Sequence, residues 1–375
     1  MIIAINANQY LPSSSNDFYV KYLVGVAASH PEHQFIFITT AKAEEPLNRS
    51  NNILHLISAP ITNNRWMRKF WLDYTLPDIV QKHKPSIVIN TGVECSMRTS
   101  VPQWVFLSDL SFLHSPLHFS KKQRSFLKNK LPGFLKKADG IVTSSDIIAK
   151  EIKQQYSIKE DKIKTFPLTV EESYQPIYWG EKETVKKSYV DGKEYFLFSG
   201  EIHPQFDLVN LLKAYSFFKT RQQSNMQLVI TASSLQSNNP FNKIFNTYKY
   251  RRDVRLLIDL PENELAKITA AAYAFIYPAY YAETALFPLR AIQCEVPVIS
   301  SQLDVLKENL GDAAFYVDPS NFEDIAEKMM LLFKDESKRA ELITCGKLIR
   351  NATRNEKLNS KWWKFILAYA KKGRK

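Results

Sequence analysis

Short apolar runs separated by polar or mixed stretches recur along this chain. Runs of roughly four to eight residues rich in Ile, Val and Phe are typical of strands buried in a parallel sheet. In the amino-terminal half we expect strands at 2–5, 34–39, 87–90, 104–108 and 140–143. In the carboxyl-terminal half we expect them at 195–199, 227–231, 254–257, 274–277 and 298–300.

These strands alternate with helical stretches, which is the pattern of parallel sheets covered on both faces. Two such series flank a polar segment, 166–193, that contains Pro167, Pro176, Gly180 and Gly192. The pattern predicts an α/β protein with two doubly wound, Rossmann-like domains, at 1–170 and 194–355, joined by a connector at 171–193. A length of 375 residues fits two or three domains.

Composition excludes several classes of protein. No run approaches the ~18 apolar residues of a membrane-spanning helix, and Met1 leads into a strand rather than a signal-type apolar segment. The cysteines Cys95, Cys294 and Cys345 are widely spaced, and zinc-type His spacing is absent. We therefore expect a cytoplasmic protein with reduced thiols, no metal and no cofactor.

Charge is the next feature, since 50 Lys and Arg against 38 Asp and Glu give a net charge of +12. One predicted helical region, 118–140, concentrates cations: Lys121, Lys122, Arg124, Lys128, Lys130, Lys136 and Lys137. Near the carboxyl end, one helix face with flanking cations would carry Trp362, Phe365, Ile366 and Tyr369. Two interpretations stay open: a solvated basic helix with the last helix packed on the first domain, or attachment to an anionic membrane surface. The cations follow no nucleic-acid recognition module, so we expect no nucleic-acid partner.

The most informative stretch, 277–319, reads YPAYYAETALFPLRAIQCEVPVISSQLDVLKENLGDAAFYVDP. It resembles the donor-site segment of glycosyltransferase family 4, E-G-F-G-x-P-x-x-E-A-M-x-C-x-x-P-V-I followed by G-D-A-A-x-Y-V-D-P. Matches include Glu308 and the final motif, with Gly311, Asp312, Asp318 and Pro319 expected in turn and cap roles. The family's two acids, which accept hydrogen bonds from the donor sugar and the ribose, fall on Ala282 and Arg290. Neither side chain can accept such a bond. Glu283 would replace the first acid if the loop shifted by one residue.

A second segment, FLFSGEIHPQFDLVNLLK at 196–213, resembles the family's F-L-F-V-G-x-x-H-P-R-K-N-x-x-N-L-L-K. Gly200 and His203 match. The Arg-Lys pair that grips the donor diphosphate in the family is Gln205 and Phe206 here, so we expect an apolar ring at the diphosphate position. Because each charge-assisted hydrogen bond contributes on the order of 1.5–3 kcal/mol, losing two weakens donor binding by about two to four orders of magnitude.

Two further sites depart from the family pattern. The loop after the first strand reads PSSSNDFYVKYLVG, without the family's early glycines, and the chain has 10 Gly where average usage gives roughly 26. In the acceptor-side segment FLSDLSFLHSP, 106–116, the family's His-Asp pair is Ser108 and Asp109, and His114 follows. Asp109 and Glu283 are therefore the candidates for catalysis.

The resemblance implies a GT-B fold, with two Rossmann-like domains facing a cleft and a final helix, 356–375, that returns to the first domain. It also implies a role in bacterial cell-surface glycan assembly. We expect nucleotide-sugar binding and transfer to be impaired or absent, with the chain acting beside an active glycosyltransferase. Peripheral contact with the inner membrane is the second of the two open interpretations of the basic and aromatic segments. The alternative is an active retaining hexosyltransferase with an altered donor site that uses Asp109, Glu283, His203 and Arg290, whose fork suits a phosphate.

Overall fold

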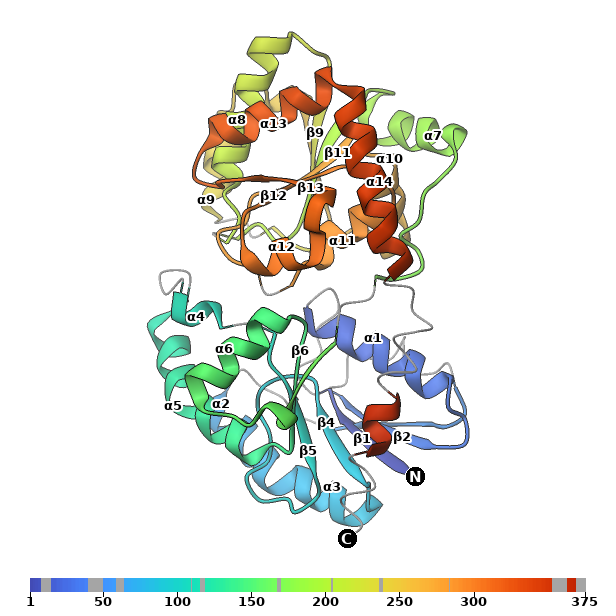
Figure 1. Cartoon of the computed structure of the whole chain (residues 1–375), viewed down its shortest axis with the longest axis vertical. Coiled ribbons are helices and arrows are strands. Elements are labelled where there is room, and N and C mark those ends of the chain that lie inside the picture. Colours follow the sequence, from blue (N-terminus) through green and yellow to red (C-terminus); the bar gives the residue numbers. More distant parts are fainter. Residues whose placement is uncertain are drawn as a thin grey trace. The chain divides into compact units, whose positions relative to one another are not determined.

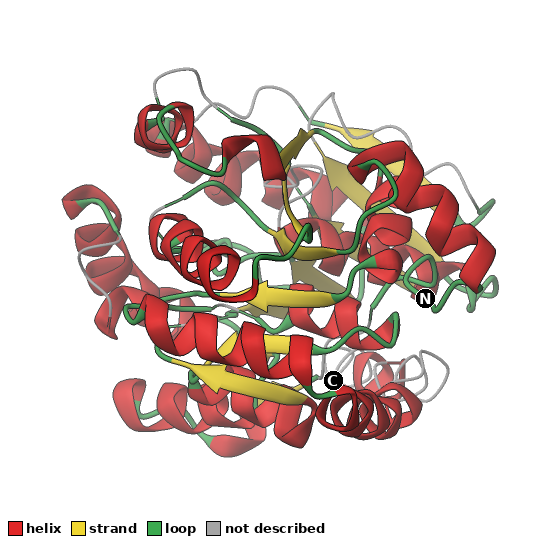
Figure 2. Cartoon of the chain, turned by 90° about the horizontal axis from the view of Figure 1, so that it is seen from above, coloured by secondary structure: helices red, strands yellow, loops and turns green. Residues whose placement is uncertain are grey.

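The chain forms two compact units, one made of residues 1–167 and 355–375 and the other of residues 168–354. The computed structural model describes residues 1–7, 15–39, 50–58, 64–108, 110–114, 119–166, 170–203, 205–235, 239–282, 284–352 and 363–368. Each unit is built on a parallel sheet with helices on both sides (Figure 1, Figure 2). The predicted α/β class with two Rossmann-like units is confirmed.

The first unit holds a seven-stranded sheet in the order β3-β2-β1-β4-β5-β6-β7. Its strands are β1 (Ile2–Asn6), β2 (Gln34–Thr39), β3 (Ile53–Ile57), β4 (Ile87–Asn90), β5 (Gln103–Phe106), β6 (Gly140–Thr143) and β7 (Ile163–Thr165). Its helices are α1 (Ser15–Ala28), α2 (Arg65–Phe70), the π-helix η2 (Trp71–Thr75), α3 (Leu76–His83), α4 (Ser111–His114), α5 (Lys121–Lys137), α6 (Asp146–Tyr156) and the 3₁₀-helix η4 (Glu160–Lys162). The strand order reverses between β1 and β4, where the Asn6 side chain donates to Asn90 Oδ1 at 2.8 Å.

A helical segment at 363–368 packs against the core of this unit. Trp363 stacks on His30 with ring centroids 3.8 Å apart, and Ile366 is fully buried. The Phe365 ring lies 4.5 Å from that of Trp104, a fully buried residue of β5. Three apolar side chains of the segment are therefore in contact with the first unit. Trp362 and Tyr369 of the predicted stripe lie outside the described residues.

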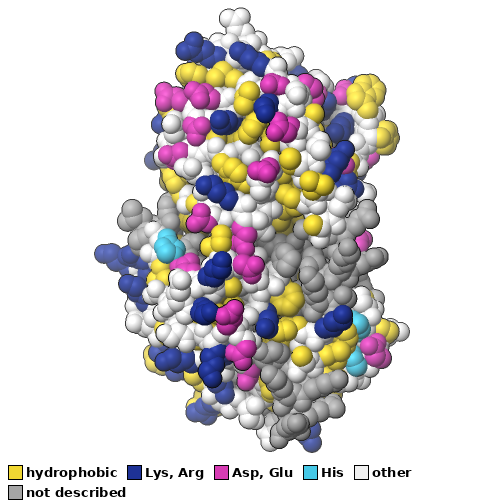
Figure 3. Space-filling view, viewed as in Figure 1, with side chains coloured by type: hydrophobic (Ala, Val, Ile, Leu, Met, Phe, Trp, Pro, Cys, Tyr) yellow, Lys and Arg dark blue, Asp and Glu magenta, His cyan; other side chains and the backbone are white. Residues whose placement is uncertain are grey.

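The predicted basic helix is α5. Ser120 begins it with a capping box, in which Ser120 Oγ accepts from Gln123 N at 3.2 Å and Gln123 Oε1 accepts from Ser120 N at 3.0 Å. Leu131 and Leu135 form its buried face. In Figure 3, Lys and Arg side chains gather on the side of the first unit where α5 lies.

The second unit holds a six-stranded sheet in the order β10-β9-β8-β11-β12-β13. Its strands are β8 (Tyr195–Ser199), β9 (Gln227–Ala232), β10 (Val254–Ile258), β11 (Ala274–Tyr277), β12 (Val298–Ser301) and β13 (Ala314–Val317). Its helices are α7 (Trp179–Val190), α8 (Leu208–Gln222), α9 (Pro240–Asn246), α10 (Glu262–Ala271), α11 (Leu286–Gln293), α12 (Asp304–Leu310), α13 (Phe322–Lys334), α14 (Glu336–Ala352) and the 3₁₀-helices η5 (Arg251–Asp253) and η6 (Gly311–Ala313). Most of the predicted connector is thus helical, since α7 lies within it and packs on α10.

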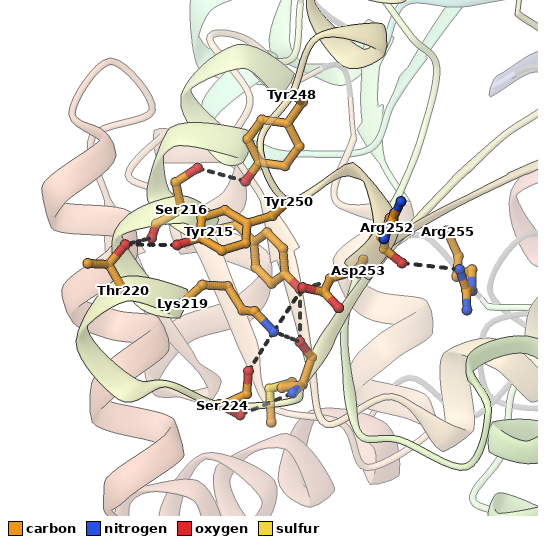
Figure 4. A network of polar contacts seen from close by, with 11 residues as sticks. Tyr215, Ser216, Lys219, Thr220, Ser224, Tyr248, Tyr250, Arg252, Asp253 and Arg255 are labelled. Atoms are coloured by element: carbon orange, nitrogen blue, oxygen red, sulfur yellow. Dashed lines mark hydrogen bonds and ion pairs between the residues drawn. The ribbon is translucent and has the colours of Figure 1, made fainter.

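A polar network anchors the carboxyl-terminal half of α8 (Figure 4). Lys219 Nζ donates to the Ser224 carbonyl at 2.5 Å and pairs with Asp253 at 3.2 Å. The Tyr215 hydroxyl donates to the Met226 carbonyl at 2.8 Å, and burial raises the pKa of this phenol. These bonds hold α8 against the loop before β9 and against η5.

Within the described ranges, no helix combines the length and the apolar character that crossing a bilayer requires.

Candidate functional site

Five of the predicted donor-site positions lie in loops at the carboxyl ends of two central strands of the second sheet. Strands β8 and β11 are parallel neighbours, and the strand order reverses between them. Ligands of such sheets bind outside the carboxyl ends of the strands at this reversal point. The loop after β8 carries Gly200, His203, Gln205 and Phe206, and the loop after β11 carries Ala282. The sheet thus brings the two matched segments together.

The two loops are hydrogen-bonded to each other. Tyr280 N donates to the Gln205 carbonyl at 2.9 Å, and Asp207 N donates to the Pro278 carbonyl at 3.1 Å. The Gln205 side chain adds a third bond, in which Nε2 donates to the Tyr281 carbonyl at 2.8 Å. Gln205, which stands where the family has Arg, therefore joins the loops instead of offering a cation.

Phe206 lies under the loop in the apolar interior. Its side chain is 6% exposed, and its ring centroid lies 5.3 Å from that of Phe198 and 5.2 Å from that of Tyr277. A Cβ on Gly200 would come within 3.0 Å of the Phe198 ring and 3.4 Å of the Phe206 ring, so the close packing suits glycine there. The Phe206 ring is thus packed on its aromatic neighbours.

Asp207 begins helix α8 and places a carboxylate at its amino terminus. Asp207 Oδ1 accepts from Asn210 N at 2.9 Å, which is an N-cap bond. Its other oxygen accepts from the Tyr280 hydroxyl at 2.5 Å. Burial, together with this carboxylate, raises the pKa of Tyr280 to about 12, so the phenol stays protonated and donates. Helix amino termini bind anions through their free backbone N–H groups. At the start of α8 the Asp207 carboxylate already accepts a hydrogen bond from one of these groups, Asn210 N.

His203 is exposed in the same loop. Its Nδ1 accepts from Gln205 N at 3.1 Å, which requires the proton of a neutral ring to sit on Nε2. The nearby Glu201 carboxylate accepts from the Ser233 hydroxyl at 2.6 Å. The polar side chains of this loop are therefore hydrogen-bonded within the second unit.

Arg290, at the position of the family's second acid, contacts two glutamates. Its Nε donates to Glu171 Oε2 at 2.9 Å while one terminal nitrogen donates to Glu171 Oε1, and that nitrogen donates to Glu262 Oε1 at 3.1 Å. The guanidinium also lies 4.7 Å from the centre of the Tyr174 ring. Burial alone would raise the pKa of Glu171, but the Arg290 charge and hydrogen bonds lower it below the ordinary value. The Arg290 guanidinium, which the sequence suggested as a phosphate ligand, is thus bound to the carboxylate of Glu171, in the segment that begins the second unit.

The remaining candidates are scattered or not described. Ala282 is 5% exposed, and Glu308 is exposed on α12. The two proposed catalytic acids, Asp109 and Glu283, lie outside the described residues. His114 forms an ion pair with Glu151 on the first unit. Among the residues that can be placed, no three His, Cys, Asp or Glu side chains form a group that would hold a metal ion.

The matched motif after β12 has the predicted turn and cap geometry. Gly311 has φ 46° and ψ −130°, a conformation that essentially only glycine adopts. Asp318 Oδ1 accepts from Ser320 N at 2.8 Å. Asn210 Nδ2 donates to the Ser320 carbonyl at 3.0 Å, which links this turn to the start of α8. Asn210 and Asp318, which match the family motifs, thus connect the turn after β13 with the start of α8.

Sequence reasoning missed three contributors, namely Tyr280, Glu171 and Glu262. For the two glutamates a signal was present, because a cation in a buried position requires an acidic partner. The position of that acidic partner could not be read from the sequence, since Glu171 lies 119 residues from Arg290.

Comparison with known proteins agrees with this geometry. Residues 181–348 match the family described as glycosyl transferases group 1. The chain is 26% identical over 275 residues to O-antigen chain mannosyltransferase B of Escherichia coli, which covers 73% of this chain and 69% of that protein. Sucrose-phosphate synthase from Thermosynechococcus elongatus superposes with a TM-score of 0.81 at 15% identity, covering 98% of each chain. WaaG, a glycosyltransferase involved in lipopolysaccharide biosynthesis, superposes with a TM-score of 0.76 at 12% identity over 96% of this chain and 98% of that one. The predicted resemblance is therefore confirmed: the chain has the GT-B fold, and its residues 181–348 are similar to group 1 glycosyl transferases.

Proposed function

We propose that this protein serves bacterial cell-surface glycan assembly while binding nucleotide sugars weakly and transferring sugar slowly or not at all. The observation that carries the proposal is the carboxylate of Asp207 at the amino terminus of α8, held by Asn210 and Tyr280. The names of the E. coli relative and of WaaG support the pathway. A chain without its own transfer activity would act as the partner of an active glycosyltransferase.

The electrostatics of the loop support weak donor binding. A donor diphosphate at this helix terminus would meet the negative charge of Asp207, and the neutral Gln205 offers no compensating cation. Two unit charges 4 Å apart interact by about 4 kcal/mol at the effective dielectric of a protein surface, so this repulsion adds to the loss of attraction. Arg290 supplies no substitute because Glu171 and Glu262 hold it.

Calorimetric titration of the intact chain with GDP-mannose and UDP-glucose tests the proposal. We expect dissociation constants no better than about millimolar. The double variant Gln205→Arg/Asp207→Asn keeps an N-cap residue and changes the charge of the loop by two units, so it should gain at least about tenfold in affinity. Gln154→Arg/Asp161→Asn makes the same charge change at exposed positions of the first unit and should gain nothing. A gain shared by both variants would mean that net charge alone is responsible.

The second candidate is an active retaining glycosyltransferase with an altered donor site. Glu283 supports it, because a carboxylate stands next to Ala282 in the sequence. Micromolar binding of a nucleotide sugar by the unmodified chain, with turnover that Glu283→Gln abolishes, would establish this candidate in place of the first.

A further inference from the structure

Helix α2 and the π-helix η2 carry an exposed aromatic ridge, which we define as Trp66, Phe70 and Tyr74. Their exposed fractions are 82%, 61% and 43%. The residues are spaced by four, and the Phe70 and Tyr74 rings stack with centroids 4.8 Å apart. Met67 and Met97 add exposed thioether side chains beside them, at 41% and 47%. Large apolar side chains gathered in this way mark an interaction surface, whereas isolated ones do not.

The side of the helices opposite the ridge is packed in the core of the first unit. The opposite face of η2 contributes Trp71 and Leu72 to a buried cluster, to which the following helix α3 adds Leu76 and Val80. Trp71 Nε1 donates to Ser58 Oγ at 2.5 Å. The buried Asp73 accepts from Met97 N at 2.9 Å, which fixes the neighbouring loop to the helix. The aromatic rings are therefore held outward by a helix whose other side is already packed.

Most charges beside the ridge are positive, and the exposed Asp78, four residues after Tyr74, is an acid next to it. Helix α2 has no acidic residue in its first turn, and its last turn contains Arg68 and Lys69. The Arg98 guanidinium lies 4.0 Å from the centre of the Tyr74 ring and donates to the Tyr74 hydroxyl at 2.8 Å. Another acid near the ridge, Glu94, is 11% exposed and pairs with Arg68 at 3.3 Å. The surface thus combines aromatic rings with cations.

We infer that the aromatic ridge is a peripheral docking site for an anionic lipid bilayer. Trp66 and Phe70 enter the interface between headgroups and acyl chains, where aromatic side chains are favoured, while Lys69 and Arg98 face the headgroups. The cations complement an anionic lipid surface more directly than they would a second, equally basic copy of this chain. Trp363, Phe365 and Ile366 are in contact with the first unit, so the bilayer contact belongs to α2 and not to the carboxyl-terminal stripe. The inference does not depend on the proposed function.

Co-sedimentation of the intact chain with vesicles of phosphatidylcholine and about 30% phosphatidylglycerol tests the inference. We expect binding at low salt, and Trp66→Ser/Phe70→Ser should weaken it by about tenfold or more. The matched control is Tyr178→Ser/Trp179→Ser, which removes two rings of the second unit that are 74% and 76% exposed, and it should bind as the parent does. Circular dichroism and melting curves of both variants should match the parent, since all four side chains are exposed.

A second readout locates the contact on Trp66 itself. Brominated phosphatidylcholine should quench part of the tryptophan fluorescence of the parent, and Trp66→Phe should lose most of that quenching. Absence of vesicle binding at low salt, or equal binding by the ridge variant and the parent, would overturn the inference. Loss of binding in Lys121→Ala/Lys122→Ala/Lys128→Ala but not in the ridge variant would assign the contact to α5. A dimer that the ridge variant abolishes, without vesicle binding by the parent, would assign the ridge to self-association.

Discussion

Arg290 and Glu171 form a two-bond ion pair across 119 residues of sequence, with Arg290 Nε donating to Glu171 Oε2 at 2.9 Å. The pair joins α11 to the segment that begins the second unit, and the side chains are 13% and 18% exposed. Glu262 of α10 completes the cluster. The residue in the place of the family's ribose-binding acid therefore has a structural role.

Restoring the family's acid at this position should destabilise the protein. Arg290→Glu would gather three carboxylates in a poorly hydrated site, and breaking a buried pair costs about 3–5 kcal/mol. At roughly 2–4 °C per kcal/mol, the melting temperature should fall by roughly 6–20 °C. The charge exchange Arg290→Glu/Glu171→Arg should recover part of the loss. A melting curve of Arg290→Glu that matches the parent would contradict the structural role.

The same pair gives stability a defined pH dependence. The folded-state pKa of Glu171 is lowered, so its contribution is complete above the unfolded value of about 4.3 and is lost as the pH falls through the folded value. The melting-temperature difference between the parent and Glu171→Gln should be largest near neutral pH and should shrink below about pH 4.3. Glu172→Gln, a substitution at an exposed neighbouring position, is the control and should change the melting temperature little at neutral pH.

Gly311 should tolerate no side chain without strain. Its φ of 46° combined with a ψ of −130° disfavours residues with a Cβ, although no atom lies within 4 Å of where a Cβ would stand. Gly311→Val should therefore cost about 1–3 kcal/mol and lower the melting temperature by several degrees. Gly133→Ala inside α5, where there is also open space, should instead stabilise by about 0.5–1 kcal/mol. Equal effects of the two substitutions would show that the backbone conformation at 311 is ordinary.

Removal of residues 361–375 should expose the surface that Trp363, Phe365 and Ile366 cover on the first unit. We expect a lower melting temperature, stronger fluorescence of the apolar dye ANS and light scattering from aggregates. Deleting 370–375 removes four cations but none of these contacts, so it should leave all three readouts unchanged. If the longer deletion remains monodisperse without dye binding, the segment contributes little to stability.

Central strands were predictable from the sequence, and most edge strands were not. The expected runs at 34–39, 87–90, 140–143, 195–199 and 274–277 have the observed bounds. The missed strands β3, β7 and β13 all lie at sheet edges and are only partly buried. An edge strand buries fewer side chains, so its apolar run is shorter or contains polar residues such as His55 and Lys164.

At the candidate site, motif matching picked out two loops that are hydrogen-bonded to each other, but it could not give the orientation of their side chains. Gly200, Gln205 and Phe206 lie in the loop after β8. The direction of the Phe206 ring depends on Phe198 and Tyr277, and the partner of Arg290 depends on Glu171. Such contacts form between positions distant in sequence, and no local pattern encodes them.

The burial of Phe206 against Gly200 makes a cation at position 206 hard to introduce by a single substitution. Lysine at 206 would place an ammonium among Phe198 and Tyr277 before any phosphate was present to compensate it. A variant of this chain with a cation at position 206 would first need different packing around β8, and only then could it accept the charge. The order in which substitutions can accumulate is therefore fixed by the aromatic core beneath the loop.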